Sequence, residues 1–306
     1  MPLGAHDAVA LVAHGTVSDL DDLREFVQQI RHGRPPSDGL VQELRRRYEA
    51  IGGSPLLELT REQARSLSRR LDAPVLVGMR LWRPSVGEVL RAAVGLKIRR
   101  LVVLPLAPFS VHVYWEAARR SRAELENEIG VQLPELVPVG AWGRQVELVR
   151  AHAALIRPLI AGARPEDTAL VMTAHSLPQR VVDAGDPYQR EVEDCAALIG
   201  AELGCPYELA FQSQGGEGGV WLGPDLAATL ERVARAGQRR VVIAPIGFLA
   251  EHVETLYDLD IEAAGWARHH GLDFQRVPAL NAHPGLIEAL ARVVELALAN
   301  GASPSA

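Results

Sequence analysis

The sequence has few cysteines, no long apolar run and no excess of positive charge. Its 306 residues include only two cysteines, Cys195 and Cys205, which cannot by themselves form a four-thiolate zinc or iron–sulfur site. The longest uncharged apolar stretch has about ten residues, whereas a membrane-spanning helix needs roughly 20. The net charge of −6 argues against a protein that binds nucleic acid by neutralising phosphates. We therefore expect no iron–sulfur cluster, no transmembrane segment and no nucleic-acid partner.

Several targeting and catalytic motifs are also missing. The first residues lack the basic start and apolar core of a signal peptide, so we expect a cytoplasmic protein. The Gly-rich loop Gln214–Gly219 lacks the Gly-Lys-Ser/Thr ending of a phosphate-binding loop, which disfavours nucleotide binding. The His-Glu-x-x-His and Gly-x-Ser-x-Gly motifs are absent, which disfavours the corresponding hydrolases.

Apolar runs rich in β-branched residues alternate with amphipathic segments along the whole chain. This alternation is typical of parallel sheets covered by helices, and the length allows two domains of about 150 residues. We predict strands near residues 8–13, 74–79, 100–105, 135–138, 168–174, 207–212, 239–247 and 274–278. We predict helices within residues 21–31, 40–48, 60–71, 146–160, 190–203 and 284–298.

The two halves of the chain begin in a similar way. Val9–Thr16 and Ala169–Pro178 each contain an apolar run that ends in Ala-His before a turn. If the halves are similar α/β domains, His14 and His175 each lie at the carboxyl end of a first strand, where such folds bind ligands.

An acidic segment, Glu251–Glu262, follows the apolar run Val241–Ala250. Helical spacing would place Glu254, Asp258 and Glu262 at i, i+4 and i+8 on one face, and each like-charged pair should cost a few tenths of a kcal/mol. No lysine or arginine lies within the segment to offset this repulsion. The row therefore indicates a face that receives a cation, and a solvated acidic surface is the alternative.

His175 gains interest from this acidic row. Both follow strands of the same half of the chain, so His175 and Glu254 could face one another across a pocket. A histidine beside a carboxylate can act as a general base, a metal ligand or both, whereas a lone histidine is more often structural.

Basic residues gather in the first half. Ile30–Pro36 contains two arginines, and Arg45–Tyr48 leads to the Gly- and Ser-containing turn Ile51–Leu56. Guanidinium groups near such backbone suit the recognition of carboxylates, although a solvated helix end would look similar. An anion-binding first half and a cation-handling second half suggest an organic polyacid that receives a metal.

These segments together resemble the ferrochelatase family. The resemblance rests on ordered matches over almost the whole chain: Tyr48–Leu56, Ala174–Pro178, Gly185–Tyr188, Gln212–Ser213, Trp221–Pro224 and Phe248–Asp260. Three further stretches are most similar to the short, soluble, monomeric coproporphyrin ferrochelatases of Gram-positive bacteria: His14–Pro36, Phe109–Tyr114 and Pro278–Pro284.

The resemblance implies an α/β fold of two Rossmann-like domains, with parallel sheets flanked by helices and a porphyrin cleft between them. The domains would be residues 1–144, joined by the C-terminal helix 284–299, and residues 145–283. The reaction would be insertion of ferrous iron into a porphyrin with release of two protons. We expect a monomer that needs no cofactor beyond its iron substrate and makes transient contacts with neighbouring heme-pathway enzymes.

The resemblance also assigns roles to residues. His175 and Glu254 would be catalytic: His175 would bind the metal or accept pyrrole protons, and Glu254 would be its partner across the macrocycle. Asp258 and Glu262 would conduct the hydrated cation. The residues that would contact the porphyrin and its propionates are His14, Arg31, Arg47, Tyr48, Ser54 and Tyr114.

Some positions depart from the family pattern. His14 stands where the coproporphyrin type usually has a tyrosine that ligates the product iron, and Leu81 replaces a histidine associated with an outer metal site. Coproporphyrin III is the expected substrate in preference to protoporphyrin IX. The alternatives are a chelatase for cobalt or a sirohydrochlorin-type ring, and a non-catalytic heme-binding protein in which His14 holds the iron permanently.

Overall fold

The computed structural model describes residues 3–129, 132–215 and 219–301. The chain divides into two compact units, Met1–Trp142 with Ala282–Ala306, and Gly143–Asn281. Residues 216–218 of the Gly-rich loop lie outside the described residues. No helix in the described part of the chain is long and apolar enough to cross a membrane.

The first unit contains a four-stranded sheet with the order β2-β1-β3-β4, in which every neighbouring pair is parallel. Its strands are β1 (Asp7–Ala13), β2 (Val75–Met79), β3 (Arg100–Pro105) and β4 (Glu135–Pro138). Its helices are η1 (Leu20–Asp22), α1 (Leu23–Ile30), α2 (Asp38–Ala50), α3 (Leu56–Leu71), α4 (Val86–Gly95), α5 (Val111–Ile129) and α12 (Pro284–Gly301). Strand β1 is buried along its whole length, as expected for a central strand of a covered parallel sheet.

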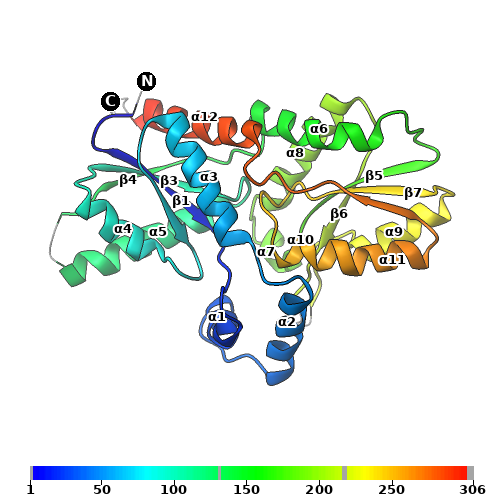
Figure 1. Ribbon diagram of the computed structural model, residues 1–306, viewed down its shortest axis with the longest axis horizontal. Helices are drawn as coiled ribbons and strands as arrows, with labels where there is room; N and C mark the ends of the chain where they lie inside the picture. Colours follow the sequence, from blue (N-terminus) through cyan, green and yellow to red (C-terminus); the bar gives the residue numbers. More distant parts are fainter. Residues whose placement is uncertain (1–2, 130–131, 216–218, 302–306) are drawn as a thin grey trace. The chain divides into compact units, whose positions relative to one another are not determined.

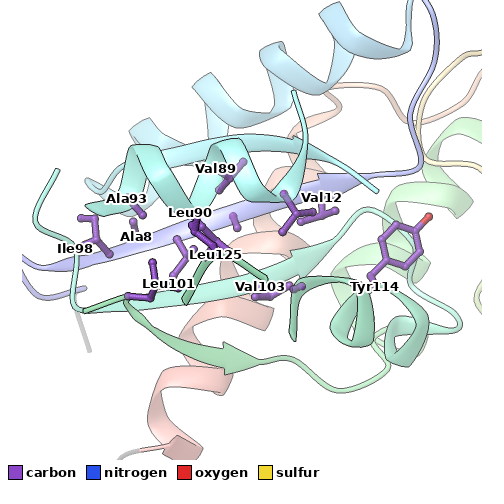
Figure 2. Packing of buried hydrophobic residues seen from close by; sticks show 14 residues of the cluster. Ala8, Val12, Val89, Leu90, Ala93, Ile98, Leu101, Val103, Tyr114 and Leu125 are labelled. Atoms are coloured by element: carbon purple, nitrogen blue, oxygen red, sulfur yellow. The ribbon is translucent and has the colours of Figure 1, made fainter. Parts of the chain in front are cut away.

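Helices cover both faces of this sheet (Figure 1). Alternate residues of β1 and β3 point to one face, where they pack against α4 and α5 in a core that includes Val12, Leu90 and Leu125 (Figure 2). Helices α3 and α12 contact each other and the strands of the sheet. An ion pair from Arg70 to Glu288, at 2.6 Å, joins these two helices.

The second unit repeats this topology. Its sheet has the order β6-β5-β7-β8, again with all neighbours parallel, so the first strand of each unit lies between the second and the third. Its strands are β5 (Thr168–His175), β6 (Glu208–Gln212), β7 (Arg240–Ala244) and β8 (Asp273–Arg276). Its α-helices are α6 (Val146–Ile160), α7 (Gln179–Asp183), α8 (Tyr188–Leu203), α9 (Leu226–Arg235), α10 (Val253–Leu256) and α11 (Ala264–His269). The strand order reverses between β5 and β7, and open α/β sheets bind ligands at the carboxyl ends of the strands at such a point.

The acidic segment is not the regular α-helix that its spacing predicts. After α10, a π-helix, η2 (Asp258–Ala263), leads into α11. The backbone N–H of Glu262 bonds the carbonyl of Tyr257, five residues earlier, at 3.1 Å. The α-helical i, i+4, i+8 register assumed for the acidic row is therefore wrong over this turn, because a π-helix has more residues per turn.

Strand β7 is shorter than the predicted 239–247, since it ends at Ala244 before Pro245. The chain then turns, and the N–H of Gly247 bonds the carbonyl of Thr173 on β5 at 3.0 Å. A Cβ at Gly247 would lie 2.7 Å from the Cα of Ala174, closer than real contacts allow. Only glycine lets this turn approach β5 so closely.

Candidate functional site

His175 and Glu254 form the centre of the candidate site in the second unit. The Nδ1 atom of His175 lies 2.8 Å from Oε2 of Glu254. The two side chains are 37% and 28% exposed, so a ligand can reach both. The structure therefore brings together the two residues predicted to be catalytic.

The sheet topology explains this contact. His175 is the last residue of β5, and Glu254 lies in the first turn of α10, which follows the neighbouring strand β7. The hydroxyl of Tyr188 donates a 2.8 Å hydrogen bond to the carbonyl of His175. The side-chain amide of Gln212 donates a bond of the same length to the carbonyl of Glu254. The side chains of Tyr188 and Gln212 thus hold the backbone at His175 and Glu254. The sequence alone indicated no role for either side chain.

The electrostatics of the pair raise the affinity of the imidazole for a proton. Burial alone would lower the pKa of His175, but the charge and hydrogen bond of Glu254 and the charge of Asp258 together raise that pKa above its ordinary value. The carboxylate also fixes the ring, because Nδ1 faces Glu254 and Nε2 is left for other contacts.

The other two acidic residues of the row occupy different surroundings. Asp258 is buried, and the hydroxyl of Ser213 donates a hydrogen bond to its carboxylate. Glu262 is partly buried on the π-helix. Within residues 3–129, 132–215 and 219–301, no group of three or more His, Cys, Asp or Glu side chains could hold a metal ion. The structure thus joins His175 with Glu254, and does not gather Asp258 and Glu262 with them into one ligand group.

An arginine from outside the acidic segment supports it. Arg276, at the end of β8, binds Glu251 at 2.8 Å and Asp260 through a second ion pair. The N–H of Ala279 also bonds Glu251 at 2.9 Å. Burial would raise the pKa of Glu251, but its hydrogen bonds and the charge of Arg276 outweigh burial and lower that pKa. Part of the acidic charge of this segment is therefore compensated by the fold.

Two of the residues predicted to contact the porphyrin lie at the carboxyl edge of the first sheet. His14 directly follows β1, its side chain is exposed, and its carbonyl accepts a 3.0 Å bond from the N–H of Leu81. Tyr48, near the end of α2, is buried, with its hydroxyl 3.1 Å from the hydroxyl of Thr16. The turn after β1 therefore carries one predicted residue and contacts another.

The remaining predicted residues belong to helices and turns of the same unit. Tyr114 lies at one end of the buried core (Figure 2), with the guanidinium of Arg80 5.4 Å from its ring centre. Arg31 caps the end of α1, and Arg47 on α2 binds Glu43 at 2.8 Å. Ser54 accepts a 3.4 Å bond from the N–H of Leu56 at the start of α3.

Comparison with known proteins identifies the family. Residues 6–298 match the family model described as Ferrochelatase. The chain belongs to the ferrochelatase family. Ferrochelatases are heme-biosynthesis enzymes that insert a metal ion into a porphyrin, so the family resemblance noted in the sequence is confirmed.

Relatives with similar sequence identity to this chain carry two different names. A Ferrochelatase of Thermus thermophilus is 36% identical, over 94% of this chain and 98% of the relative. A Coproporphyrin III ferrochelatase of Anoxybacillus flavithermus is 34% identical, over 93% of this chain and 94% of the relative. These relatives therefore agree on the ferrochelatase family, but only some of their names specify a porphyrin.

Among solved structures, SirB from Bacillus subtilis with Fe3+ shares the fold. Its TM-score is 0.61 at 14% identity, with 96% of each chain covered. This likeness confirms the predicted α/β architecture of two parallel sheets flanked by helices.

Proposed function

We propose that this ferrochelatase inserts ferrous iron into coproporphyrin III, with His175 and Glu254 as the reacting pair. The observation that carries this proposal is the 2.8 Å contact between the imidazole and the carboxylate, with both side chains partly exposed. Insertion requires a group that accepts pyrrole protons and a group that holds a hard divalent cation weakly enough to release it. Imidazole and carboxylate supply these two properties.

We propose a role for each group of the pair. Glu254 orients the imidazole through Nδ1 and stabilises the imidazolium that forms when Nε2 accepts a pyrrole proton. Its carboxylate also offers oxygen ligands to the incoming iron. The carboxylate leaves the other positions of the ion for water and then for the ring nitrogens. Asp258 and Glu262, further along the same segment, are proposed to conduct the hydrated ion.

The first unit is proposed to bind the porphyrin and its carboxylates. Coproporphyrin III has four propionates and protoporphyrin IX has two, so a surface with many arginine and hydroxyl groups favours the former. Relatives named Coproporphyrin III ferrochelatase support this choice. The proposed contacts are His14, Arg31, Arg47, Tyr48, Ser54 and Tyr114.

The deciding experiment measures anaerobic insertion of ferrous iron by absorbance, with coproporphyrin III and protoporphyrin IX in parallel. We expect turnover with both and a higher kcat/KM for coproporphyrin III. A preference for protoporphyrin IX would overturn the substrate assignment. Binding without turnover on either porphyrin would instead favour a heme-binding protein.

A further inference from the structure

A cavity of about 820 Å³ lies in the first unit, bordered by α5, the edge strand β4 and the turn that joins α4 to β3. Small-molecule sites commonly measure about 300–1,000 Å³. None of the residues that line the cavity is among those proposed above to bind the porphyrin. Ile98 and Arg99 precede β3, so this part of the cavity lies at the amino end of that strand, whereas His14 follows the carboxyl end of β1. The cavity is therefore a second candidate site.

One part of the cavity wall is apolar and includes an aromatic ring. Trp115 of α5 and Leu136 of β4 are partly buried hydrophobic residues that pack against the core of the first unit. Ile98 is 7% exposed and belongs to that core. An indole side chain offers a large, rigid face on which a planar aromatic ligand can stack.

The rest of the wall is strongly basic. Among the described lining residues there are four cations and one carboxylate, that of Glu135: the cations are Lys97, Arg99, Arg119 and Arg122. In the part of the chain that the structure describes, the side chains of Lys97 and Arg99 are exposed and have no hydrogen bond or ion pair. These two cations are free to bind an anion.

The other two cations come from α5 and have acidic partners, and Arg122 also lies 3.4 Å from the carbonyl of Pro134. Arg119 is 3.4 Å from Glu116, a long ion pair, and Arg122 is 2.7 Å from Glu126. Arg119 lies four residues after Trp115 and Arg122 three residues after Arg119, so all three share one face of the helix. Cations thus enter the cavity from two separate elements beside a common aromatic surface.

This arrangement suits a flat polycarboxylate better than a nucleotide. Guanidinium forks bind carboxylates bidentately, and cations on two elements can reach carboxylates at separate points of one ligand. Nucleotide phosphates favour a helix N-terminus, whereas α4 presents its C-terminal end to the cavity, with Val94 and Lys97. The partial negative charge of that end opposes a concentrated phosphate charge.

We propose that the cavity binds a second molecule of carboxylated tetrapyrrole, in addition to the molecule that reacts. This inference rests on the proposed function, which supplies the ligand. The four cations correspond in number to the four propionates of coproporphyrin III, and the apolar wall with Trp115 contacts the ring. Iron insertion leaves the carboxylates unchanged, so the cavity would bind both the metal-free substrate and the iron-containing product.

The test is a titration of the full chain with coproporphyrin III, followed by absorbance and tryptophan fluorescence. We expect a tight first equivalent and a weaker second equivalent whose affinity falls as salt rises. Arg99→Glu should weaken the second equivalent about tenfold or more, because it removes one attraction and adds a repulsion. The first equivalent and iron insertion should be unchanged.

Arg120→Glu is the matched control, because Arg120 is an exposed arginine of α5 that does not line the cavity. A single equivalent in the wild type, or equal weakening by both variants, would overturn the second site while leaving the proposed function intact. Displacement of the second equivalent by ATP would overturn the tetrapyrrole assignment. Loss of all porphyrin binding and turnover would instead refute the proposed function itself.

Discussion

Gln212 connects the two halves of the His175–Glu254 pair. It is the register partner of His175 across β5 and β6, and its side-chain amide donates a 2.8 Å hydrogen bond to the carbonyl of Glu254. The N–H of Ser176 bonds the carbonyl of Gln212 at 2.7 Å. One side chain at the end of an outer strand therefore holds the carboxylate-bearing segment beside the strand that carries the histidine.

Replacing Gln212 by leucine should lower kcat for iron insertion by about fivefold, the equivalent of one hydrogen bond of roughly 1 kcal/mol. The KM for porphyrin should stay the same, because Gln212 acts by positioning Glu254. Gln238→Leu is the matched control, since Gln238 donates a 2.9 Å bond to the carbonyl of Pro165 elsewhere in this unit. Equal effects of both variants on kcat would contradict the positioning role.

His175→Ala should reduce iron insertion about 100-fold or more, because it removes the proposed proton acceptor. Porphyrin binding, measured by fluorescence quenching, should persist. The exposed His269 provides the control variant His269→Ala, which should leave the rate unchanged. Unaltered turnover in His175→Ala would exclude the catalytic assignment.

Asp258→Asn should raise the iron concentration needed for half-maximal rate more than it lowers the maximal rate. The substitution keeps the size of the side chain and its ability to accept the bond from Ser213, but removes the charge proposed to conduct the cation. Initial rates over a range of ferrous iron concentrations measure this. An unchanged iron dependence would argue against the conduit.

Arg276→Met should destabilise the protein by about 3–5 kcal/mol, because it leaves a buried carboxylate without its partner. Arg276 and Glu251 are 12% and 11% exposed. Removing both charges in Glu251→Gln with Arg276→Met should recover part of the loss. The free energy of unfolding in urea measures these effects.

The control for that series is Arg70→Met. Arg70 and Glu288 form an ion pair that is 39% and 48% exposed, and such surface pairs contribute about 0–1 kcal/mol. If Arg70→Met costs as much as Arg276→Met, burial is not the cause of the larger effect.

Asp7→Asn should change the acid sensitivity of the first unit. Burial would raise the pKa of Asp7, but its bonds from Arg100 at 2.8 and 2.6 Å and from Gly4 at 2.7 Å outweigh burial and lower that pKa below 3.8. A carboxyl with a depressed folded pKa stabilises above its unfolded pKa, and this contribution is lost as pH falls through the folded value.

The wild type should therefore exceed Asp7→Asn in stability by about 1.5–3 kcal/mol near neutral pH, the range for hydrogen bonds to charged groups. The difference should shrink below about pH 4, where the unfolded carboxyl protonates. Urea unfolding at a series of pH values measures it. If the stability difference between wild type and Asp7→Asn stays constant as pH falls below about 4, the ionised Asp7 carboxylate is not its cause.

Hydrophobic patterning predicted most of the sheet framework. The predicted strands 100–105 and 135–138 coincide with β3 and β4, because continuous apolar runs between turns mark buried parallel strands. Helix α5 was not predicted, since it begins with Val111 and four residues that include valine, tyrosine and tryptophan, types that favour strands. Tertiary packing on the sheet overrides that local preference.

Only part of the candidate site could be predicted from the sequence. The pairing of His175 with Glu254 follows from two strand ends on one sheet, but the contacts of Gln212 and Ser213 require the strand order β6-β5-β7. The π-helix was missed, because an i→i+5 turn leaves no signal in a 3.6-residue period. Arg276 was missed because it lies outside the acidic segment in sequence.

The discontinuous first unit has a consequence for synthesis on the ribosome. Its helix α12 packs on α3, although more than 200 residues separate them in the chain. The second unit, Gly143–Asn281, is continuous and emerges before α12. The nascent chain should therefore complete its later-encoded unit before it closes its earlier-encoded unit, and the apolar surface of α3 should stay uncovered until α12 has been synthesised.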